Sequence, residues 1–349
     1  MIPTTRSIIQ FTGEGTLALN TEACPRPGPG QVLIETHRSL ISTGTEMTVF
    51  KRRFAAGTHW DNWVKYPFST GYLNAGVVVA VGEGVQGWKE GDRIASREGH
   101  ASHVLAYVDS KGQVDGPSLA RPIPHGLSDD AACWMGLGKI VQVGVRAAEH
   151  ALGDVVVVIG LGLLGQLAVQ YARLSGASRV IGIDTAPKRL EMASAHGATD
   201  VIQGTAAEAL ERVRAIAAMH GVDGADVVYD ITGHPAVLAQ ALPLARRFGK
   251  VVLLGDAGDP SRQTLTTDVI TRGVRIIAAH DCNPSQSPTP LSRWSSVQIH
   301  DAFLGWLARG DMRVTDLITD RFKPEQAAQA YALLDARRDQ AMGVIFEWN

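Results

Sequence analysis

Three glycines and one aspartate in the middle of the chain have the types and spacing needed to bind a dinucleotide. Gly160, Gly162 and Gly165 follow the G-x-G-x-x-G pattern, and Asp184 stands nineteen residues after the last of them. The first glycine permits a tight turn, the second lets the backbone approach a pyrophosphate, and the third brings a helix close to a strand. A carboxylate at about this distance accepts hydrogen bonds from a ribose 2′-hydroxyl. The pattern therefore predicts a dinucleotide site.

Asp184 also indicates which dinucleotide binds. Its carboxylate would repel the 2′-phosphate of NADP, so the sequence predicts NAD as the cofactor. Lys188 and Arg189 follow closely and can soften this preference, or they are solvated residues at the start of the next helix. The predicted cofactor-binding residues comprise the glycine turn, the start of the next helix, the acid with its neighbours, and two later positions: Gly160, Gly162, Leu163, Leu164, Gly165, Asp184, Thr185, Arg189, Thr232 and Gly255.

The segments around the glycines read as alternating strands and helices. Residues 155–159 are a β-branched apolar run, which is typical of a strand buried on both faces of a parallel sheet. A helix follows, with Leu164, Leu167, Ala168, Tyr171 and Leu174 on one face, and then a strand at 179–184. Further strands are expected at 226–230, 250–254 and 275–279. This alternation predicts an α/β domain with a doubly wound parallel sheet.

The remaining segments predict a second domain. Residues 7–121 contain short apolar strands separated by glycine and proline turns, which suits a small barrel or a partly open sheet. Ser128 can cap a short helix. After a proline- and serine-rich loop at 280–292, a helix at 296–309 and a strand at 343–347 return the chain to this domain. We expect a catalytic domain over residues 1–148 and 291–349, and a cofactor domain over residues 149–290.

Composition narrows the partners and the compartment. The formal charge of −2 over 349 residues gives no reason to expect nucleic acid or an anionic membrane. No apolar run approaches the ~18 residues of a membrane span, and the first residues lack the apolar core of a signal peptide. Cys24, Cys133 and Cys282 are odd in number and far apart, so no disulfide framework is implied and a cytoplasmic location is expected.

The chain resembles the medium-chain dehydrogenase/reductase superfamily over nearly its whole length. The matching stretches are residues 76–82 (GVVVAVG), 91–95 (GDRIA), the glycine turn, and residues 317–331. Residues 41–46 (ISTGTE), Gly71-Tyr72 and Arg293-Trp294 more narrowly resemble the subgroup around bacteriochlorophyllide dehydrogenases. The resemblance implies a GroES-like β-barrel catalytic domain, a Rossmann cofactor domain, and a homodimer formed through edge strands near residues 275–279.

The chain departs from the zinc alcohol dehydrogenases of this superfamily at the metal site. Their Cys-Gly-x-Asp motif reads Thr43-Gly44-Thr45-Glu46, their Gly-His-Glu motif reads Gly71-Tyr72-Leu73, and a frequent Glu-Pro pair reads Met135-Gly136. The four-cysteine structural loop is also missing from the sequence. Zinc requires thiolate, imidazole or carboxylate ligands, so we predict no metal. His100 and His103 lack a third ligand at matching spacing, so we expect no unrelated metal site there.

Without zinc, a side chain must take the proton of the substrate hydroxyl. Lys139 is the first candidate, because members of the resembling family commonly place a threonine beside the nicotinamide at this position, and a cationic ring and burial depress a lysine pKa. His100 is the second, since imidazole titrates near neutrality. Tyr72 can form a hydrogen bond with the substrate oxygen or relay its proton. Glu46 can pair with Lys139 or accept a hydrogen bond from a substrate hydroxyl. The structural alternatives are a solvent-facing lysine, a surface histidine, a packed tyrosine and a supporting carboxylate.

The substrate class follows from the mixture of polar and aromatic candidates. Asn74, Trp134 and Trp294 are expected to line the pocket. Polar groups for several hydroxyls, with aromatic faces for ring carbons, suit a sugar, cyclitol or related polyol that is oxidised at a secondary alcohol. A bulky ring substrate is the second option. Two other classes stay open: an NADPH-dependent enone or quinone reductase, which Asp184 disfavours, and a non-catalytic NAD-binding protein.

Overall fold

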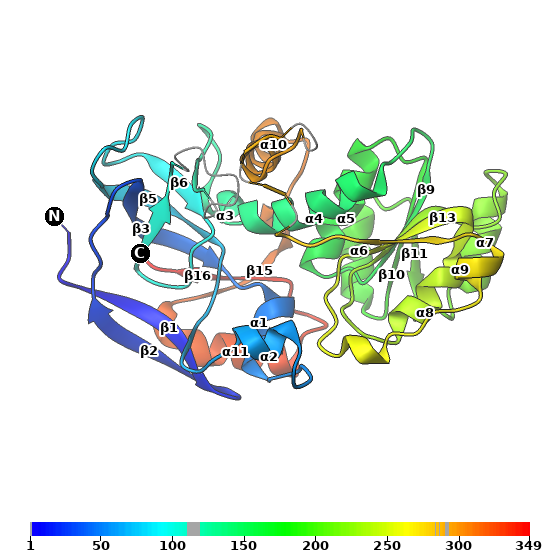
Figure 1. Cartoon of the computed structure of the whole chain (residues 1–349), viewed down its shortest axis with the longest axis horizontal. Helices are drawn as coiled ribbons and strands as arrows, with labels where there is room; N and C mark the ends of the chain where they lie inside the picture. The colour runs from blue at the N-terminus through cyan, green and yellow to red at the C-terminus, as the bar shows by residue number, and fades with distance from the viewer. Residues whose placement is uncertain (1, 110–118, 283, 286, 290–292) are drawn as a thin grey trace. The chain divides into compact units, whose positions relative to one another are not determined.

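The computed structural model describes residues 2–109, 119–282, 284–285, 287–289 and 293–349 (Figure 1). The chain forms two compact units. Unit 1 comprises Met1–Arg53, Trp63–Lys139 and Pro284–Asn349, and unit 2 comprises Phe54–Asn62 and Ile140–Asn283. Among the described residues, every helix is too short or too polar to cross a bilayer.

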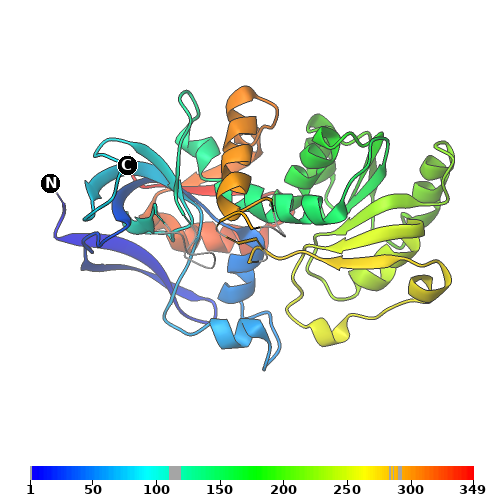
Figure 2. The ribbon, with the colours of Figure 1, turned by 45° about the horizontal axis from the view of Figure 1, so that its top comes forward.

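Unit 2 contains a six-stranded sheet in the order β11-β10-β9-β12-β13-β14, and each pairing in it is parallel. The expected α/β class with a doubly wound parallel sheet is thereby confirmed. β13 and β14 lie side by side in both overall views (Figures 1 and 2). The elements of this unit are β9 (Val155–Ile159), α5 (Leu163–Leu174), β10 (Arg179–Asp184), α6 (Pro187–Ala195), β11 (Asp200–Gln203), α7 (Leu210–Ala218), β12 (Ala225–Asp230), α8 (Val237–Ala241), β13 (Ala245–Leu253), α9 (Asp268–Thr271) and β14 (Arg275–Ala278).

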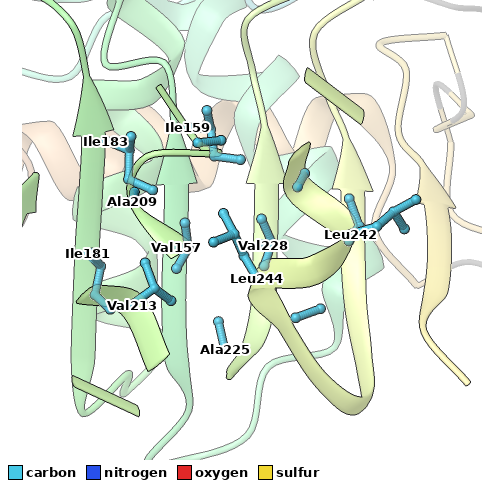
Figure 3. Packing of buried hydrophobic residues seen from close by; sticks show 14 of the residues in the cluster. Val157, Ile159, Ile181, Ile183, Ala209, Val213, Ala225, Val228, Leu242 and Leu244 are labelled. Carbon is cyan, nitrogen blue, oxygen red and sulfur yellow. The ribbon is translucent and has the colours of Figure 1, made fainter. Parts of the chain in front are cut away.

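The sheet of unit 2 is buried on both faces, as the apolar run of β9 predicts. Val157, Ile181 and Val228 face a core cluster that also contains Val213 of α7 and Leu244 of the 3-10 turn Leu242–Leu244 (Figure 3). Val252 faces the other way and contacts the backbone of α4 (Met135–Ala148) near Gly144. Helix packing on both faces leaves the strand ends as the place where polar groups can gather.

Unit 1 contains two sheets built largely from antiparallel pairs. One has the order β2-β1-β4, and the other has the order β15-β16-β3-β5-β6-β8, with β7 pairing to β3. This agrees with the expected GroES-like domain. The elements are β1 (Thr5–Gly13), β2 (Thr16–Ala23), β3 (Gln31–Leu40), α1 (Thr43–Phe50), β4 (Phe68–Ser69), β5 (Asn74–Val81), β6 (Arg93–Ser96), β7 (His103–Tyr107), β8 (Arg121–Pro122), α3 (Asp129–Ala132), α10 (Ser296–Arg309), β15 (Ile318–Phe322), α11 (Ala327–Ala336) and β16 (Gly343–Glu347).

Some details differ from the sequence-based expectations. Strand β3 runs from Gln31 to Leu40, and its second half pairs with both β5 and β16. Leu174 lies at the end of α5 and is largely exposed, so the apolar face of this helix stops at Tyr171. Ser128 caps α3 as expected, accepting a hydrogen bond from the Ala131 amide.

The compact units also differ from the expected domain limits. The short segment Phe54–Asn62, which includes most of α2 (His59–Trp63), groups with unit 2. The Ala55 amide donates to the Gly258 carbonyl, and His59 pairs with Asp256, which explains the attachment. The other limit falls inside α4, at Lys139, and the expected limit at 290/291 lies outside the described residues.

Candidate functional site

The turn between β9 and α5 has the geometry that the three glycines predict. Gly160 adopts φ +88°, a left-handed conformation that suits glycine. A Cβ on Gly165 would lie 2.1 Å from the Gly160 carbonyl oxygen, so only glycine allows this approach of helix to strand. A Cβ on Gly162 would meet nothing within 4 Å. Open space therefore lies beside the first turn of α5, where Leu163 and Leu164 present their amides.

Asp184 ends β10 beside this turn and is held by backbone donors. Its Oδ2 accepts from the Leu161 amide at 2.7 Å, and its Oδ1 accepts from the Ala186 amide at 2.9 Å. The Arg189 guanidinium lies 3.7 Å from Oδ2. Thr185 follows on the exposed surface. Each carboxylate oxygen keeps a second lone pair, so the group can still accept a hydrogen bond from a ribose.

Thr232 and Gly255 follow the adjacent strands β12 and β13. Thr232 donates through its hydroxyl to Asp230 at 2.8 Å, and the Gly255 amide donates to the Asp230 carbonyl at 2.9 Å. A Cβ on Gly255 would lie 2.5 Å from the Gly233 nitrogen, so this crossing of two loops requires glycine. Burial raises the pKa of Asp230, against the hydrogen bonds from Thr232 that lower it.

The predicted cofactor residues thus gather at the carboxyl ends of β9, β10, β12 and β13. Strands β10 and β11 lie on one side of β9 and strands β12, β13 and β14 lie on the other, so the strand order reverses at β9. Ligands of doubly wound sheets bind at such a switch point, and pyrophosphate binds at the helix N-terminus there. The open space at Gly162 and the carboxylate at Asp184 fit a nicotinamide dinucleotide.

In unit 1, Glu46 joins four separate segments of the chain. Its Oε1 accepts from the Ser42 amide at 2.7 Å, and its Oε2 accepts from the Thr70 hydroxyl at 2.8 Å. The Tyr331 hydroxyl of α11 donates to Oε2, and the Nε2 atom of His100 lies 3.1 Å from the same oxygen. Glu46 is only 2% exposed. The carboxylate is therefore already saturated by protein donors.

These contacts determine the charge of Glu46. Burial alone would raise its pKa, but the charge and hydrogen bond of His100, together with the hydroxyls of Tyr331 and Thr70, outweigh burial and hold the pKa below its ordinary value. The group is thus a buried, ionised carboxylate.

His100 is fully buried beside Glu46, and both of its ring nitrogens are engaged. Its Nδ1 lies 2.8 Å from the Ser39 hydroxyl, which also accepts from the Trp348 indole at 2.9 Å. The ring thus lies between Glu46 at Nε2 and Ser39 at Nδ1, so each nitrogen has a hydrogen-bond partner within the protein. The surface-loop alternative for His100 is wrong, because the ring is 0% exposed.

Tyr72 differs from the other proton-transfer candidates in being only half-buried. Its hydroxyl lies 2.5 Å from the Ser42 hydroxyl and 3.3 Å from the Thr45 hydroxyl. The Arg97 guanidinium covers its ring, with the central carbon 4.8 Å from the ring centroid. Burial raises the pKa of Tyr72, while the positive charge of Arg97 and the two hydroxyls oppose that rise.

Lys139 is buried on α4, not directed to solvent, at 4% exposure. Two glycines allow α4 to fit its surroundings: a Cβ on Gly138 would overlap the Phe303 ring of α10, and one on Gly136 would overlap Leu73. Positions three apart on a helix share a face, so Lys139 and Gly136 lie on the same side. Arg97, which covers the Tyr72 ring, donates to the Gly136 carbonyl, so the start of α4 lies near Tyr72.

The three predicted pocket residues are mostly enclosed. Asn74 is 0% exposed and donates to the Thr36 hydroxyl at 2.9 Å, and Trp134 is 0% exposed against Gly343. Trp294 is half-buried, with the Arg293 guanidinium over its ring. Only Trp294 of this set shows surface in unit 1.

Three residues of the candidate site were not predicted from the sequence: Tyr331, Arg97 and Ser42. Tyr331 is 285 positions from Glu46, and a tyrosine in an apolar helix face gives no sign of such a partner. Arg97 follows β6 in a stretch that reads as a turn. Ser42 precedes a helix, so N-cap preference marks it, but nothing in its spacing indicates Tyr72.

The residues at the family's metal position do not fit zinc. Thr43 and Tyr72 stand at two ligand positions, and their hydroxyls are poor zinc donors. Glu46 already accepts from four protein groups. In the part of the chain that the structure describes, no three histidine, cysteine, aspartate or glutamate side chains come together as a metal site.

Comparisons with known proteins match this architecture. The family model described as zinc-binding dehydrogenase matches residues 164–296, and the alcohol dehydrogenase GroES-like domain matches residues 28–116. The chain is 27% identical to the L-threonine 3-dehydrogenase of Bacillus licheniformis, covering 94% of this chain and 95% of that protein. It is 26% identical to the D-guloside 3-dehydrogenase of Shigella flexneri, covering 80% and 78%.

Solved structures share the fold over the full length. An alcohol dehydrogenase from Escherichia coli CFT073 complexed with NADH superposes with a TM-score of 0.80 at 19% identity, covering 99% of this chain and 100% of that one. A putative zinc-binding dehydrogenase from Sinorhizobium meliloti bound to NADP gives 0.80 at 20% identity, with the same coverage. The chain belongs to the zinc-type medium-chain dehydrogenase superfamily and is an oxidoreductase of the alcohol dehydrogenase type.

Proposed function

We propose that this protein oxidises a secondary alcohol of a polyhydroxylated small molecule with NAD, and does so without zinc. The proposal rests on the position and the contacts of Tyr72. This tyrosine replaces a metal-binding histidine of the family, and it is the half-buried member of the four proton-transfer candidates. Its hydroxyl is held by Ser42 and Thr45 and lies beneath the charge of Arg97. These features support Tyr72 as the group that contacts the substrate oxygen.

The reaction divides between the cofactor and the protein. A bound nicotinamide supplies the acceptor for the hydride of the carbinol carbon. The protein must take the hydroxyl proton, and Tyr72 in its phenolate form can accept it at Oη. Because burial raises the pKa of Tyr72, the phenol predominates at neutral pH. We therefore expect alcohol oxidation to accelerate as the pH rises into the alkaline range, and carbonyl reduction to slow there.

Lys139, the first candidate from the sequence, is the second candidate for the proton acceptor in this proposal, after Tyr72. The Lys139 side chain is buried on α4, three residues after Gly136, whose carbonyl accepts a hydrogen bond from Arg97. Glu46 and His100 are better suited to support, since their polar atoms bind other protein groups and both are shielded from solvent. In this scheme Glu46 fixes Ser42 at the start of α1, and Ser42 orients the Tyr72 hydroxyl.

The choice of NAD rests on Asp184. Backbone amides fix its carboxylate at the end of β10, where it would repel a 2′-phosphate. Arg189 lies 3.7 Å away and reduces the local negative charge, so the preference is expected to be moderate.

The substrate class rests on chemistry and on the relatives. The names of the related proteins include D-guloside and sorbitol dehydrogenases, and both names denote polyhydroxylated substrates. The hydroxyl groups of Ser42, Thr45 and Tyr72 supply hydrogen bonds of the kind such a substrate requires. A bulky ring alcohol is the alternative.

A substrate panel tests this function. Purified protein is incubated with NAD and, separately, with hexoses, hexitols, cyclitols and aldonates, and NADH formation is followed by absorbance. Oxidation of at least one panel member that falls about 100-fold in Tyr72→Phe is expected. NADPH-dependent reduction of an enone or quinone, with no oxidation of any polyol, would refute the proposal.

We also propose a homodimer formed along β14. This strand ends the sheet of unit 2, and Ile276 and Ile277 on it are only partly buried. Phe248 and Ile270, which precede β14 in the same unit, are exposed at 60% and 87%. An uncovered edge strand with apolar neighbours favours pairing with a second copy.

The three cysteines are unpaired, which favours a reducing cytoplasm as the location of the protein.

A further inference from the structure

The Arg97 guanidinium is held over the Tyr72 ring by helix α4. Its Nη1 donates to the Gly136 carbonyl at 3.2 Å, while its central carbon lies 4.8 Å from the ring centroid. A Cβ on Gly136 would lie 2.9 Å from Arg97 Cδ and 2.5 Å from Leu73 Cδ2. The glycine therefore leaves the space that this arginine occupies. The first turn of α4 fixes a positive charge against the ring.

Other charged or titratable groups near Tyr72 do not provide this effect. Glu46 is the neighbouring carboxylate, and its negative charge opposes ionisation of the phenol. His100 packs against Gly71, but its ring nitrogens face Glu46 and Ser39. Lys139 lies one turn further along α4. Among the charges that act on Tyr72, Arg97 has the largest influence that favours the ionised ring.

We propose that Arg97 is a positioning residue for proton transfer: its guanidinium stabilises the Tyr72 phenolate and so supplies the positive charge that a metal ion supplies elsewhere in the superfamily. The inference rests on the proposed function, in which Tyr72 accepts the substrate proton. In that step the substrate O–H bond breaks and an O–H bond forms at Tyr72 Oη. The negative charge leaves the Tyr72 oxygen as the phenol forms, and Arg97 keeps the base form available beforehand.

Simple electrostatics gives the expected size of the effect. An opposite charge within about 4–6 Å favours the ionised form by about one to three pH units. A guanidinium stacked on an aromatic face is held in one orientation and is less hydrated than an ammonium, so lysine is an imperfect substitute. Loss of the charge should therefore move the titration of Tyr72 upward by about one pH unit or more.

Ionisation of Tyr72 can be measured without a substrate. The protein contains six tyrosines, which can be labelled with carbon-13 at the ring carbon that bears the hydroxyl. Tyr72→Phe identifies the Tyr72 resonance by its loss. The pH titration of that resonance is then compared in the wild type, Arg97→Met, Arg97→Gln and Arg97→Lys. Arg121→Met is the matched control, because Arg121 belongs to the same unit but pairs with Asp301.

The proposal predicts an upward shift of about one pH unit or more in Arg97→Met and Arg97→Gln, a smaller shift in Arg97→Lys, and none in Arg121→Met. Arg97→Gln retains a donor for Gly136, so it serves if the methionine variant does not fold. An unchanged Tyr72 titration in a folded charge-free variant would overturn the proposal. A resonance that stays phenolic up to alkaline unfolding in the wild type would do the same.

The kinetic profile separates failure of this inference from failure of the proposed function. With a polyol that the wild type oxidises, the pH midpoint of kcat/KM should shift with the Tyr72 titration in each Arg97 variant. A titration that shifts in a protein inactive on every polyol would contradict the function but not the role of Arg97. Activity that requires Tyr72 but keeps its pH midpoint in Arg97→Gln would contradict the role of Arg97 alone.

Discussion

The Glu46 carboxylate lies 3.1 Å from the Nε2 atom of His100, and both side chains are buried in unit 1. The same carboxylate accepts from Thr70, Tyr331 and the Ser42 amide. It therefore joins the start of α1, the segment before β5, the segment before β7, and α11. Glu46, which stands in the motif that binds the metal in the zinc enzymes of the family, thus links four segments of unit 1 by hydrogen bonds.

Replacing Glu46 by glutamine should destabilise the protein by about 2–4 kcal/mol, because an amide cannot accept all four donors and leaves some of them buried without a partner. Urea unfolding measures the change. Glu149→Gln is the matched control: Glu149 is exposed in unit 2, and its replacement should change stability by less than about 0.5 kcal/mol. A Glu46→Gln protein as stable as the control would contradict the claim that the hydrogen bonds of Glu46 stabilise the fold.

The pH dependence of stability should also change in Glu46→Gln. The folded protein holds the pKa of Glu46 below its ordinary value, so the ionised group stabilises the fold above the unfolded-state pKa. That stabilisation is lost as the pH falls through the depressed pKa. Part of the acid destabilisation of the wild type should therefore be missing in the variant, as seen in urea midpoints measured from neutral to acidic pH. Parallel curves for both proteins would oppose this assignment.

Lys139→Ala should lower turnover by about 100-fold or more while leaving NAD affinity nearly intact, if the buried amine takes part in proton transfer. Steady-state kinetics on an oxidised polyol and NADH fluorescence titration give the two values. Lys89→Ala, which alters an exposed lysine of the same unit, should leave both unchanged. Wild-type turnover in Lys139→Ala would remove this residue from the mechanism and leave Tyr72 as the sole acceptor.

Asp184→Asn should shift the cofactor preference toward NADP. The amide retains an acceptor for one backbone donor but removes the charge that repels a 2′-phosphate, so the NADPH-to-NADH affinity ratio should rise about tenfold, or ~1.4 kcal/mol. Fluorescence titration with each reduced cofactor measures the ratio. Glu211→Gln, an exposed change in the same unit, is the control. An unaltered ratio in Asp184→Asn would show that Asp184 does not discriminate.

The cofactor edge could be predicted from sequence because its signals are local. Gly160, Gly165 and Asp184 lie within one strand–helix–strand unit, so spacing alone predicts their geometry. The strands β9 and β10 and the helix α10 begin and end where periodicity places them.

The catalytic side was less predictable, because its contacts join distant segments. Glu46 meets Tyr331 across 285 positions, and no local pattern indicates such a pair. His100 reads as a loop histidine, yet the loop turns inward and buries it. The role of Arg97 depends on its packing against Gly136 of α4, a contact that the sequence does not indicate.

Metal content with and without chelation tests the central claim most directly. The purified protein is analysed for zinc by elemental analysis, and NAD-dependent oxidation of an active polyol is measured before and after dialysis against a strong chelator. We predict well under one zinc per chain and the same activity after dialysis, because the residues at the metal position are poor ligands. One zinc per chain, with activity lost on chelation and restored by zinc alone, would contradict the account.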